Sequence, residues 1–246
     1  MKVLLISGHG AGDPGALGQG YKESDLTREL VNLIKPHLEK YTDVTVYDQN
    51  RNAFKDVSTG DFKFNKFDYA FEVHFNAFTD EKAHGTECYV TTMEKGITVE
   101  QNIMRRMGRY FTLRDNDGIF DGVKRTNFLV IKTLKNHGIS GALLETCFIT
   151  NHTDMLIYQA NKNAIAEDIA GGIIDGFKLN KVVSNYYQAF NNKSIVDGLK
   201  SIGVNSSYDN RKAIAKANGI VNYFGTVEQN LKLCELAREG KLKKIG

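Results

Sequence analysis

The chain has 246 residues, of which 41% are apolar and 25% are charged, a composition typical of a globular protein and unlike that of disordered or fibrous chains. No apolar run approaches the roughly 18 residues of a transmembrane helix, so we expect no membrane insertion. The net charge of +3 is small for this length and by itself indicates no particular partner.

The N-terminal residues and the cysteines both bear on the compartment. Lys2 is followed only by the apolar stretch VLLI before Ser7, which is too short for the apolar core of a signal peptide. We therefore expect synthesis in the cytoplasm without a cleaved signal. The three cysteines, Cys88, Cys147 and Cys234, form no C-x-x-C pair and indicate free thiols rather than a disulfide framework.

Residues 1–179 alternate strand-like apolar runs with helical patterns. Strands are predicted at residues 2–7, 43–48, 67–77, 85–92 and 141–149. Helices are predicted at residues 24–41, with Ser24 as N-cap, at 98–113 and at 163–179. Residues 49–66 are a long loop or a short helix, and residues 127–134 a strand or a short helix. This alternation predicts an α/β domain with a mostly parallel, twisted sheet flanked by helices.

A different pattern follows Leu179. Residues 180–192 are predicted to be a linker, and residues 193–246 a small all-α domain of three helices. The three helical segments are residues 195–202, capped by Ser194, residues 210–218, started by Ser207 or Asp209 and ended by Gly219, and residues 226–239, with the capping-box pair Thr226 and Gln229.

The C-terminal segment is basic. Residues 187–246 hold ten Lys or Arg and five Asp or Glu, a net charge of +5, whereas the rest of the chain is close to neutral. Because residues 193–246 contain no histidine, we expect this domain to bind rather than to catalyse. The charge alone is compatible with nucleic acid, with an anionic cell wall, or with a contribution to solubility only. Tyr223 and Phe224 are candidates for stacking on sugar or for the core.

Four ionisable residues are predicted to meet at one edge of the sheet. His9 follows the first strand between two glycines, His74 and Glu145 lie late in two other strands, and Glu23 precedes the first helix. Ligands of parallel α/β sheets bind at the carboxyl ends of the strands. Two imidazoles and one carboxylate are a common catalytic zinc set, and a further carboxylate can move the protons. His9, Glu23 and His74 fit the ligand role and Glu145 the role of the base.

Structural explanations of the same residues stay open at this point. His9 can be a turn residue, His74 a buried structural histidine, and Glu23 a first-turn carboxylate favoured by the helix dipole. Glu145 is harder to explain in this way, because an unpaired carboxylate buried in the run ALLETCF costs several kcal/mol. Cys147 follows Glu145 by two residues, which in an extended strand places both on one face, so a Cys–His nucleophile is a minor alternative.

Four motifs give the chain a resemblance to a known enzyme family. They are SGHGAGDPGALGQGYKESDLTREL, EVHFNA, HGTECYV and LLETCFITNHTDMLIY. In this order they resemble the zinc-dependent N-acetylmuramoyl-L-alanine amidases of bacterial autolysins and phage endolysins. The resemblance implies Zn²⁺ on His9, Glu23 and His74, a catalytic Glu145 and a substrate-binding Asn76. The chain departs from the family in HGISGALLE, where a proline is expected, and before His74, where the region is shorter than in many relatives.

The resemblance implies a peptidoglycan hydrolase that cleaves the amide between N-acetylmuramic acid and L-alanine of the stem peptide. A zinc-activated water would attack, with Glu145 as general base and acid. The C-terminal segment is similar to the small helical cell-wall-binding domains of phage lysins. Its positive charge suits the anionic polymers of bacterial cell walls. The expected partners are therefore peptidoglycan and an associated wall polymer, and not nucleic acid.

A phage-encoded enzyme of this kind would act on the wall after holin-type release from the host cytoplasm. Two other functions stay open: a zinc peptidase that cuts within the stem peptide, and a non-catalytic wall- or nucleic-acid-binding protein. The sequence indicates no particular oligomeric state.

Overall fold

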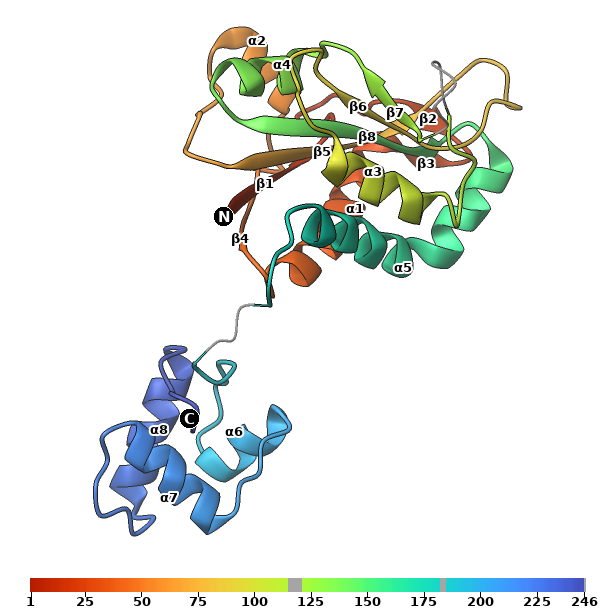
Figure 1. Ribbon diagram of the computed structural model, residues 1–246. Helices are drawn as coiled ribbons and strands as arrows, with labels where there is room; N and C mark the ends of the chain where they lie inside the picture. The colour runs from red at the N-terminus through yellow and green to blue at the C-terminus, as the bar shows by residue number, and fades with distance from the viewer. Residues whose placement is uncertain (115–120, 182–184, 246) are drawn as a thin grey trace. The chain divides into compact units, whose positions relative to one another are not determined.

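The structure is a computed structural model that describes residues 1–114, 121–181 and 185–245 (Figure 1). The chain divides into two compact units, Met1–Val182 and Val183–Gly246. The predicted fold class is confirmed, because the first unit is a mostly parallel sheet flanked by helices and the second is formed by three short helices. Within the described ranges, no helix combines the length and apolarity needed to cross a membrane.

The sheet of the first unit has six strands in the order β4-β1-β5-β8-β6-β7. They are β1 (Lys2–Ser7), β4 (Asp43–Val46), β5 (Tyr69–Asn76), β6 (Glu87–Val90), β7 (Val123–Arg125) and β8 (Ser140–Phe148). Every neighbouring pair is parallel except β6 and β8. The carboxyl ends of β1, β5 and β8 therefore lie side by side at one edge of the sheet.

Helices cover both faces of this sheet (Figure 1). One face carries α1 (Glu23–Leu38), α3 (Thr98–Met107) and α5 (His152–Gly176), and the other carries α2 (Ala53–Thr59) and α4 (Leu129–Asn136). Strand side chains alternate between the two faces. On β5, Phe71 and Val73 enter the larger core under α1, α3 and α5, whereas Ala70 packs in the smaller core with α2 and α4. The later residues of β5 on this second face are Glu72 and His74.

Several element boundaries differ from the predictions. Ser24 is not the N-cap of α1: the helix begins at Glu23, the cap position Lys22 makes no side-chain bond, and Ser24 lies in the first turn. A short antiparallel hairpin, β2 (Leu17–Gly18) and β3 (Tyr21–Lys22), leads the chain directly into α1. The last helix of this unit begins at His152 instead of residue 163, because Asn151 caps it by accepting a hydrogen bond from Asp154 N.

The second unit contains α6 (Ile195–Ser201), α7 (Tyr208–Ala217) and α8 (Val227–Arg238). Ser194, Ser207 and Thr226 cap the three helices, and the capping box of Thr226 with Gln229 is present. Its core includes Phe190, from the predicted linker, and Tyr223, which is 2% exposed, whereas Phe224 is 74% exposed. The cysteines Cys88, Cys147 and Cys234 are free, as predicted, and all three are buried.

Candidate active site

The loop after β1 holds His9 in an unusual backbone conformation. Gly8 N donates to Val73 O, which continues the pairing of β1 with β5 by one residue. His9 then has a φ of 61°, a left-handed conformation uncommon outside glycine. Arg28 of α1 donates to the carbonyl oxygens of Gly8 and His9. The helix therefore fixes the conformation of the loop that carries the first histidine.

Gly8 leaves room for the second histidine. A Cβ atom at this position would lie 2.3 Å from Cε1 of His74, which is closer than side-chain contacts allow. The glycines around His9 were expected to leave space for another group. At Gly8 this space is occupied by the imidazole of His74, which lies late in β5. Any larger residue at position 8 must displace that ring.

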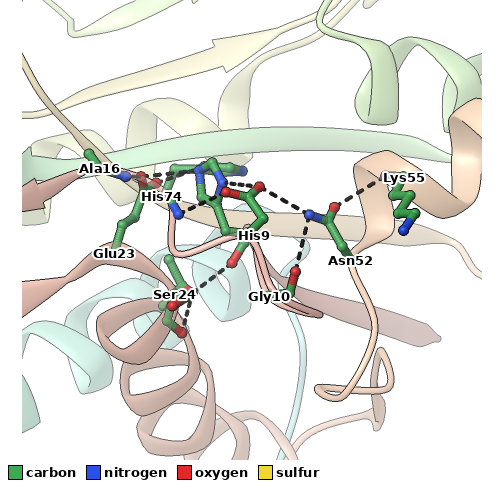
Figure 2. A network of polar contacts seen from close by, with 12 residues as sticks. His9, Gly10, Ala16, Glu23, Ser24, Asn52, Lys55 and His74 are labelled. Atoms are coloured by element: carbon green, nitrogen blue, oxygen red, sulfur yellow. Dashed lines mark hydrogen bonds and ion pairs between the residues drawn. The ribbon is translucent and has the colours of Figure 1, made fainter.

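Glu23 lies between the two histidines (Figure 2). Its Oε2 is 3.1 Å from His9 Nε2, and its Oε1 is 2.9 Å from His74 Nδ1. The candidate ligand atoms of the three residues all lie within 4.8 Å of one another. The structure therefore brings together the three residues that the sequence predicts as metal ligands, and they form a candidate metal site.

The carboxylate of Glu23 is also fixed by the backbone. Ala16 N donates to Oε2 at 2.9 Å, and Phe75 N donates to Oε1 at 3.0 Å. Burial opposes the charged form of Glu23, but hydrogen bonds from His74 and His9 outweigh it and lower the pKa of the carboxyl group. Burial likewise opposes the imidazolium of His74, yet Glu23 and Glu72 raise its pKa well above the usual value. The raised pKa of His74 means that its imidazole is protonated over a wider pH range in the metal-free protein, and a metal ion that binds there would displace this proton.

Two further residues support His9 from outside this cluster. Asp13 Oδ2 is 2.8 Å from His9 Nδ1 and also accepts a hydrogen bond from Asn52 Nδ2 at 3.1 Å. The Asn52 side-chain oxygen accepts from Lys55 N and so caps α2 (Figure 2). Sequence reasoning did not single out Asp13 or Asn52 as site residues. Their role depends on the path of two loops, for which the sequence holds no periodic signal.

Glu145 lies directly opposite His74 in the pairing of β5 with β8. Its Oε2 atom is buried and has no hydrogen-bond partner in the part of the chain that the structure describes. Burial raises the pKa of Glu145 to about 7, with the nearby carboxylates Glu23 and Glu87 adding to the effect and His74 opposing it. A carboxyl group with this pKa is divided between its acid and base forms at neutral pH.

The predicted shared face of Glu145 and Cys147 is wrong. The register of β8 shifts between the pairs His74–Glu145 and Asn76–Phe148, so β8 contains one more residue than β5 over this stretch. Cys147 consequently packs in the larger core on the opposite face, where burial raises the pKa of its thiol well above the usual value. This environment keeps the thiol neutral and inert.

Asn76 lies at the end of β5 and donates a hydrogen bond to Glu87. Glu87 is also paired with Lys124. The predicted role of Asn76 in substrate binding remains a prediction, and in the structure this side chain supports a buried ion pair beside Glu145.

A pocket of about 370 Å³ opens beside the histidines. Its polar wall holds the ionisable side chains of His9, Asp13, Glu72, His74 and Glu145. Its apolar wall is formed by the start of α2, with Ala53 and Phe54, and by Phe128, Leu129 and Val130 at the start of α4, together with Leu143. The pocket is therefore lined both by two of the candidate metal ligands, His9 and His74, and by the carboxyl group of Glu145.

A parallel α/β sheet with two histidines, a carboxylate and a separate unpaired carboxyl group at its edge defines a candidate metal-dependent hydrolase. The N-acetylmuramoyl-L-alanine amidase family matches residues 3–175 of this chain. The chain therefore belongs to this family, which confirms the predicted family and the class of enzyme.

Individual relatives agree with this assignment. The chain is similar to a Staphylococcus aureus (strain NCTC 8325 / PS 47) protein named "Probable autolysin PH", with 28% identity over 70% of this chain and 38% of that protein. It is 29% identical to an endolysin of Bacillus phage SPP1 over 73% of this chain and 67% of that protein. The fold resembles the catalytic domain of CwlV, an N-acetylmuramoyl-L-alanine amidase from Bacillus (Paenibacillus) polymyxa var. colistinus, with a TM-score of 0.55 and 22% identity over 73% of this chain and all of that domain.

Proposed function

We propose that this protein is a zinc-dependent peptidoglycan amidase of the lysin type. It would hydrolyse the amide between the lactyl group of N-acetylmuramic acid and L-alanine of the stem peptide. The observation that carries the proposal is the cluster of His9, Glu23 and His74 next to the unpartnered carboxyl group of Glu145. The family match and the endolysin and autolysin relatives support the choice of the muramoyl–L-alanine amide as the bond that is cleaved and of peptidoglycan as the substrate polymer.

The donor set fits zinc. Two imidazole nitrogens and one carboxylate are among the common ligands of catalytic Zn²⁺, and bonds of about 2.0–2.2 Å in a tetrahedron place ligand atoms about 3.4 Å apart. The separations of 2.9 and 3.1 Å between Glu23 and the two histidines are close to this requirement. His9, Glu23 and His74 would hold the ion, which would supply a Lewis acid for the amide carbonyl and lower the pKa of water in the site.

Glu145 is the group that moves the proton. In its charged form the carboxylate accepts a proton from the attacking water, and the new C–O bond forms on the amide carbonyl carbon. The same carboxyl group then returns the proton to the leaving nitrogen as the C–N bond breaks. The products are a muramic acid carboxylic acid and a stem peptide with a free L-alanine amine. In the metal-free protein burial raises the pKa of Glu145 to about 7, so the carboxyl group is neither a strong acid nor held permanently neutral, as both transfers require.

The reaction is tested by digestion of purified peptidoglycan and mass spectrometry of the products. We expect intact stem peptides that begin with a free L-alanine amine. A zinc chelator such as 1,10-phenanthroline is expected to stop the reaction, and added Zn²⁺ to restore it. Cuts within the stem peptide would instead establish a peptidase. Full activity in the presence of the chelator would contradict the zinc mechanism.

The second unit would hold the enzyme on an anionic polymer of the wall. Its segment 187–246 carries a net charge of +5, and among its described residues Lys241 is the only lysine with a carboxylate within 4 Å. Lys212 and Lys216 line a groove of about 500 Å³ together with one carboxylate, Asp209, and with Val221, which is 74% exposed. Unpaired lysines beside an exposed apolar side chain suit a polymer that presents both phosphate or carboxylate groups and sugar surfaces. If the protein is phage-encoded, release from the host cytoplasm would precede this step.

Cosedimentation of the full chain with purified walls tests this role. Reversing Lys212 and Lys216 to glutamate is expected to reduce the bound fraction severalfold at low salt, as is removal of the anionic polymers from the walls. The matched control reverses Lys63 and Lys66, two exposed lysines of the first unit, and should bind as the unaltered protein does. Retention on DNA with no affinity for walls would contradict the proposal.

A further inference from the structure

Glu72 is a buried carboxylate in the pocket that the proposed reaction does not use. It lies on β5 two residues before His74, and the residue is 3% exposed. In the sheet it pairs with Ile6 of β1 and Leu143 of β8, so its cross-strand neighbours are apolar. A carboxylate in such surroundings costs several kcal/mol unless it is bonded. Its presence therefore calls for a partner.

That partner is the outer nitrogen of His74. Oε1 of Glu72 lies 3.3 Å from His74 Nε2, while His74 Nδ1 faces Glu23. The other oxygen, Oε2, is buried without a hydrogen-bond partner among the described residues. Glu72 thus has one contact with a titratable group, and this contact is to a candidate metal ligand.

The two histidines are arranged in the same way. His9 faces Glu23 through Nε2 and the outer carboxylate of Asp13 through Nδ1. His74 faces Glu23 through Nδ1 and the outer carboxylate of Glu72 through Nε2. A metal ion binds only a nitrogen that carries no proton, so a carboxylate on the far nitrogen keeps the proton away from the metal side. Because Glu72 stands to His74 as Asp13 stands to His9, both carboxylates are placed to hold the proton on the nitrogen that faces away from Glu23.

We infer that Glu72 is a positioning residue for the proposed metal site: by accepting the Nε2–H of His74, it keeps Nδ1 free and directed at the position next to Glu23. This inference rests on the proposed function, because it requires that His74 binds zinc. Glu72 transfers no proton to the substrate in this scheme, and Glu145 remains the group that does.

The test is the zinc affinity of the full-length protein, measured by competition with a chromophoric chelator. Glu72→Ala is expected to lower the affinity about 10- to 100-fold, the usual effect of losing an outer carboxylate. Glu72→Gln keeps a carbonyl oxygen that can accept from Nε2–H, so its affinity should lie between those of Glu72→Ala and the unaltered protein.

Glu100→Gln is the matched control, because Glu100 is equally buried but accepts its hydrogen bond from Tyr69 and contacts neither histidine. Its zinc affinity should be unchanged. If Glu72→Ala does not fold, ¹⁵N NMR of the zinc-loaded unaltered protein decides the matter, since it must show the Nε2–H form of His74. An unchanged affinity in Glu72→Ala, or a His74 proton on Nδ1, overturns the inference. Failure of the unaltered protein to bind zinc would instead overturn the proposed function.

Discussion

Replacement of Glu145 by glutamine is expected to lower kcat on purified peptidoglycan by about 10²- to 10⁴-fold, the usual contribution of a general acid–base group. Glutamine has the same shape but accepts no proton from water. Because Glu145 is not one of the three candidate ligands, the zinc content should not change. The measurements are the rate of appearance of free L-alanine amines and the metal content of the purified variant.

The same substitution should stabilise the metal-free protein at alkaline pH. The pKa of Glu145 is raised from 4.5 to about 7, so the folded state holds this proton more tightly than the unfolded state does. The free energy of unfolding of the unaltered protein therefore falls as the pH rises from about 4.5 to about 7, whereas glutamine does not titrate. We expect Glu145→Gln to gain on the order of 3 kcal/mol at pH 8 and little at pH 4 in urea unfolding.

Glu94→Gln is a suitable control for this pair of measurements, because Glu94 is a half-buried residue whose carboxylate pairs with Lys135 outside the pocket. It should keep its activity and show no gain in stability at pH 8. Substantial activity in Glu145→Gln would show that another group moves the proton. A loss of zinc in that variant would show that the carboxylate also binds the metal.

Replacement of Glu23 by alanine should abolish both zinc binding and activity. Glu23 is the central member of the cluster and is held by Ala16 N and Phe75 N, so its loss leaves two histidines that no longer share a carboxylate. We expect substoichiometric zinc after dialysis and a fall in kcat/KM of more than about 10³-fold, because the site would lose a ligand and its Lewis acid together. Metal analysis and the product assay measure the two effects.

The dependence of the free energy of unfolding on pH in the acid range provides a second test of Glu23. Its pKa is lowered in the folded state, so its charged form stabilises the metal-free protein above about pH 4.5, and this contribution is lost as the pH falls further. Glu23→Ala should therefore be less stable than the unaltered protein at pH 7, with a smaller difference in strong acid. Stoichiometric zinc in Glu23→Ala would remove this residue from the ligand set. If zinc is retained in Glu145→Gln and lost in Glu23→Ala, the two carboxylates have different roles: Glu145 moves protons and Glu23 binds the metal.

The sequence predicts the cluster because parallel strands end at a common edge. His9 follows β1, His74 lies late in β5 and Glu145 lies opposite it on β8, so alternation and strand direction are enough to bring them together. Glu72 was not predicted, although it stands in the apolar run YAFEVHF as Glu145 stands in ALLETCF. Both carboxylates carry the same cost of burial in an apolar strand, so Glu72 is identifiable from the sequence on the same grounds as Glu145.

Other features of the site and of the helix boundaries depend on contacts between loops, which the periodicity of apolar residues does not predict. The support of His9 by Asp13 and Asn52 requires that the loop after β1 and the start of α2 come together, and the sequence holds no signal for this. The sequence does not predict the start of α5 at His152, because the apolar residues 155–158 are followed by a mostly polar stretch at 159–163. It also does not predict that α1 begins before Ser24, because the hairpin that leads into the helix is only two residues long on each side.

The irregularity in β8 has a consequence for metal chemistry. With regular pairing, Cys147 would share the pocket face with Glu145. A thiolate is a strong zinc ligand, and four protein ligands give closed sites that hold zinc for structure rather than for catalysis. One additional residue in β8 turns this sulfur toward the opposite core and leaves only oxygen and nitrogen donors on the pocket face. Removing that residue from the strand would thus place a thiol on the pocket face, beside Glu145.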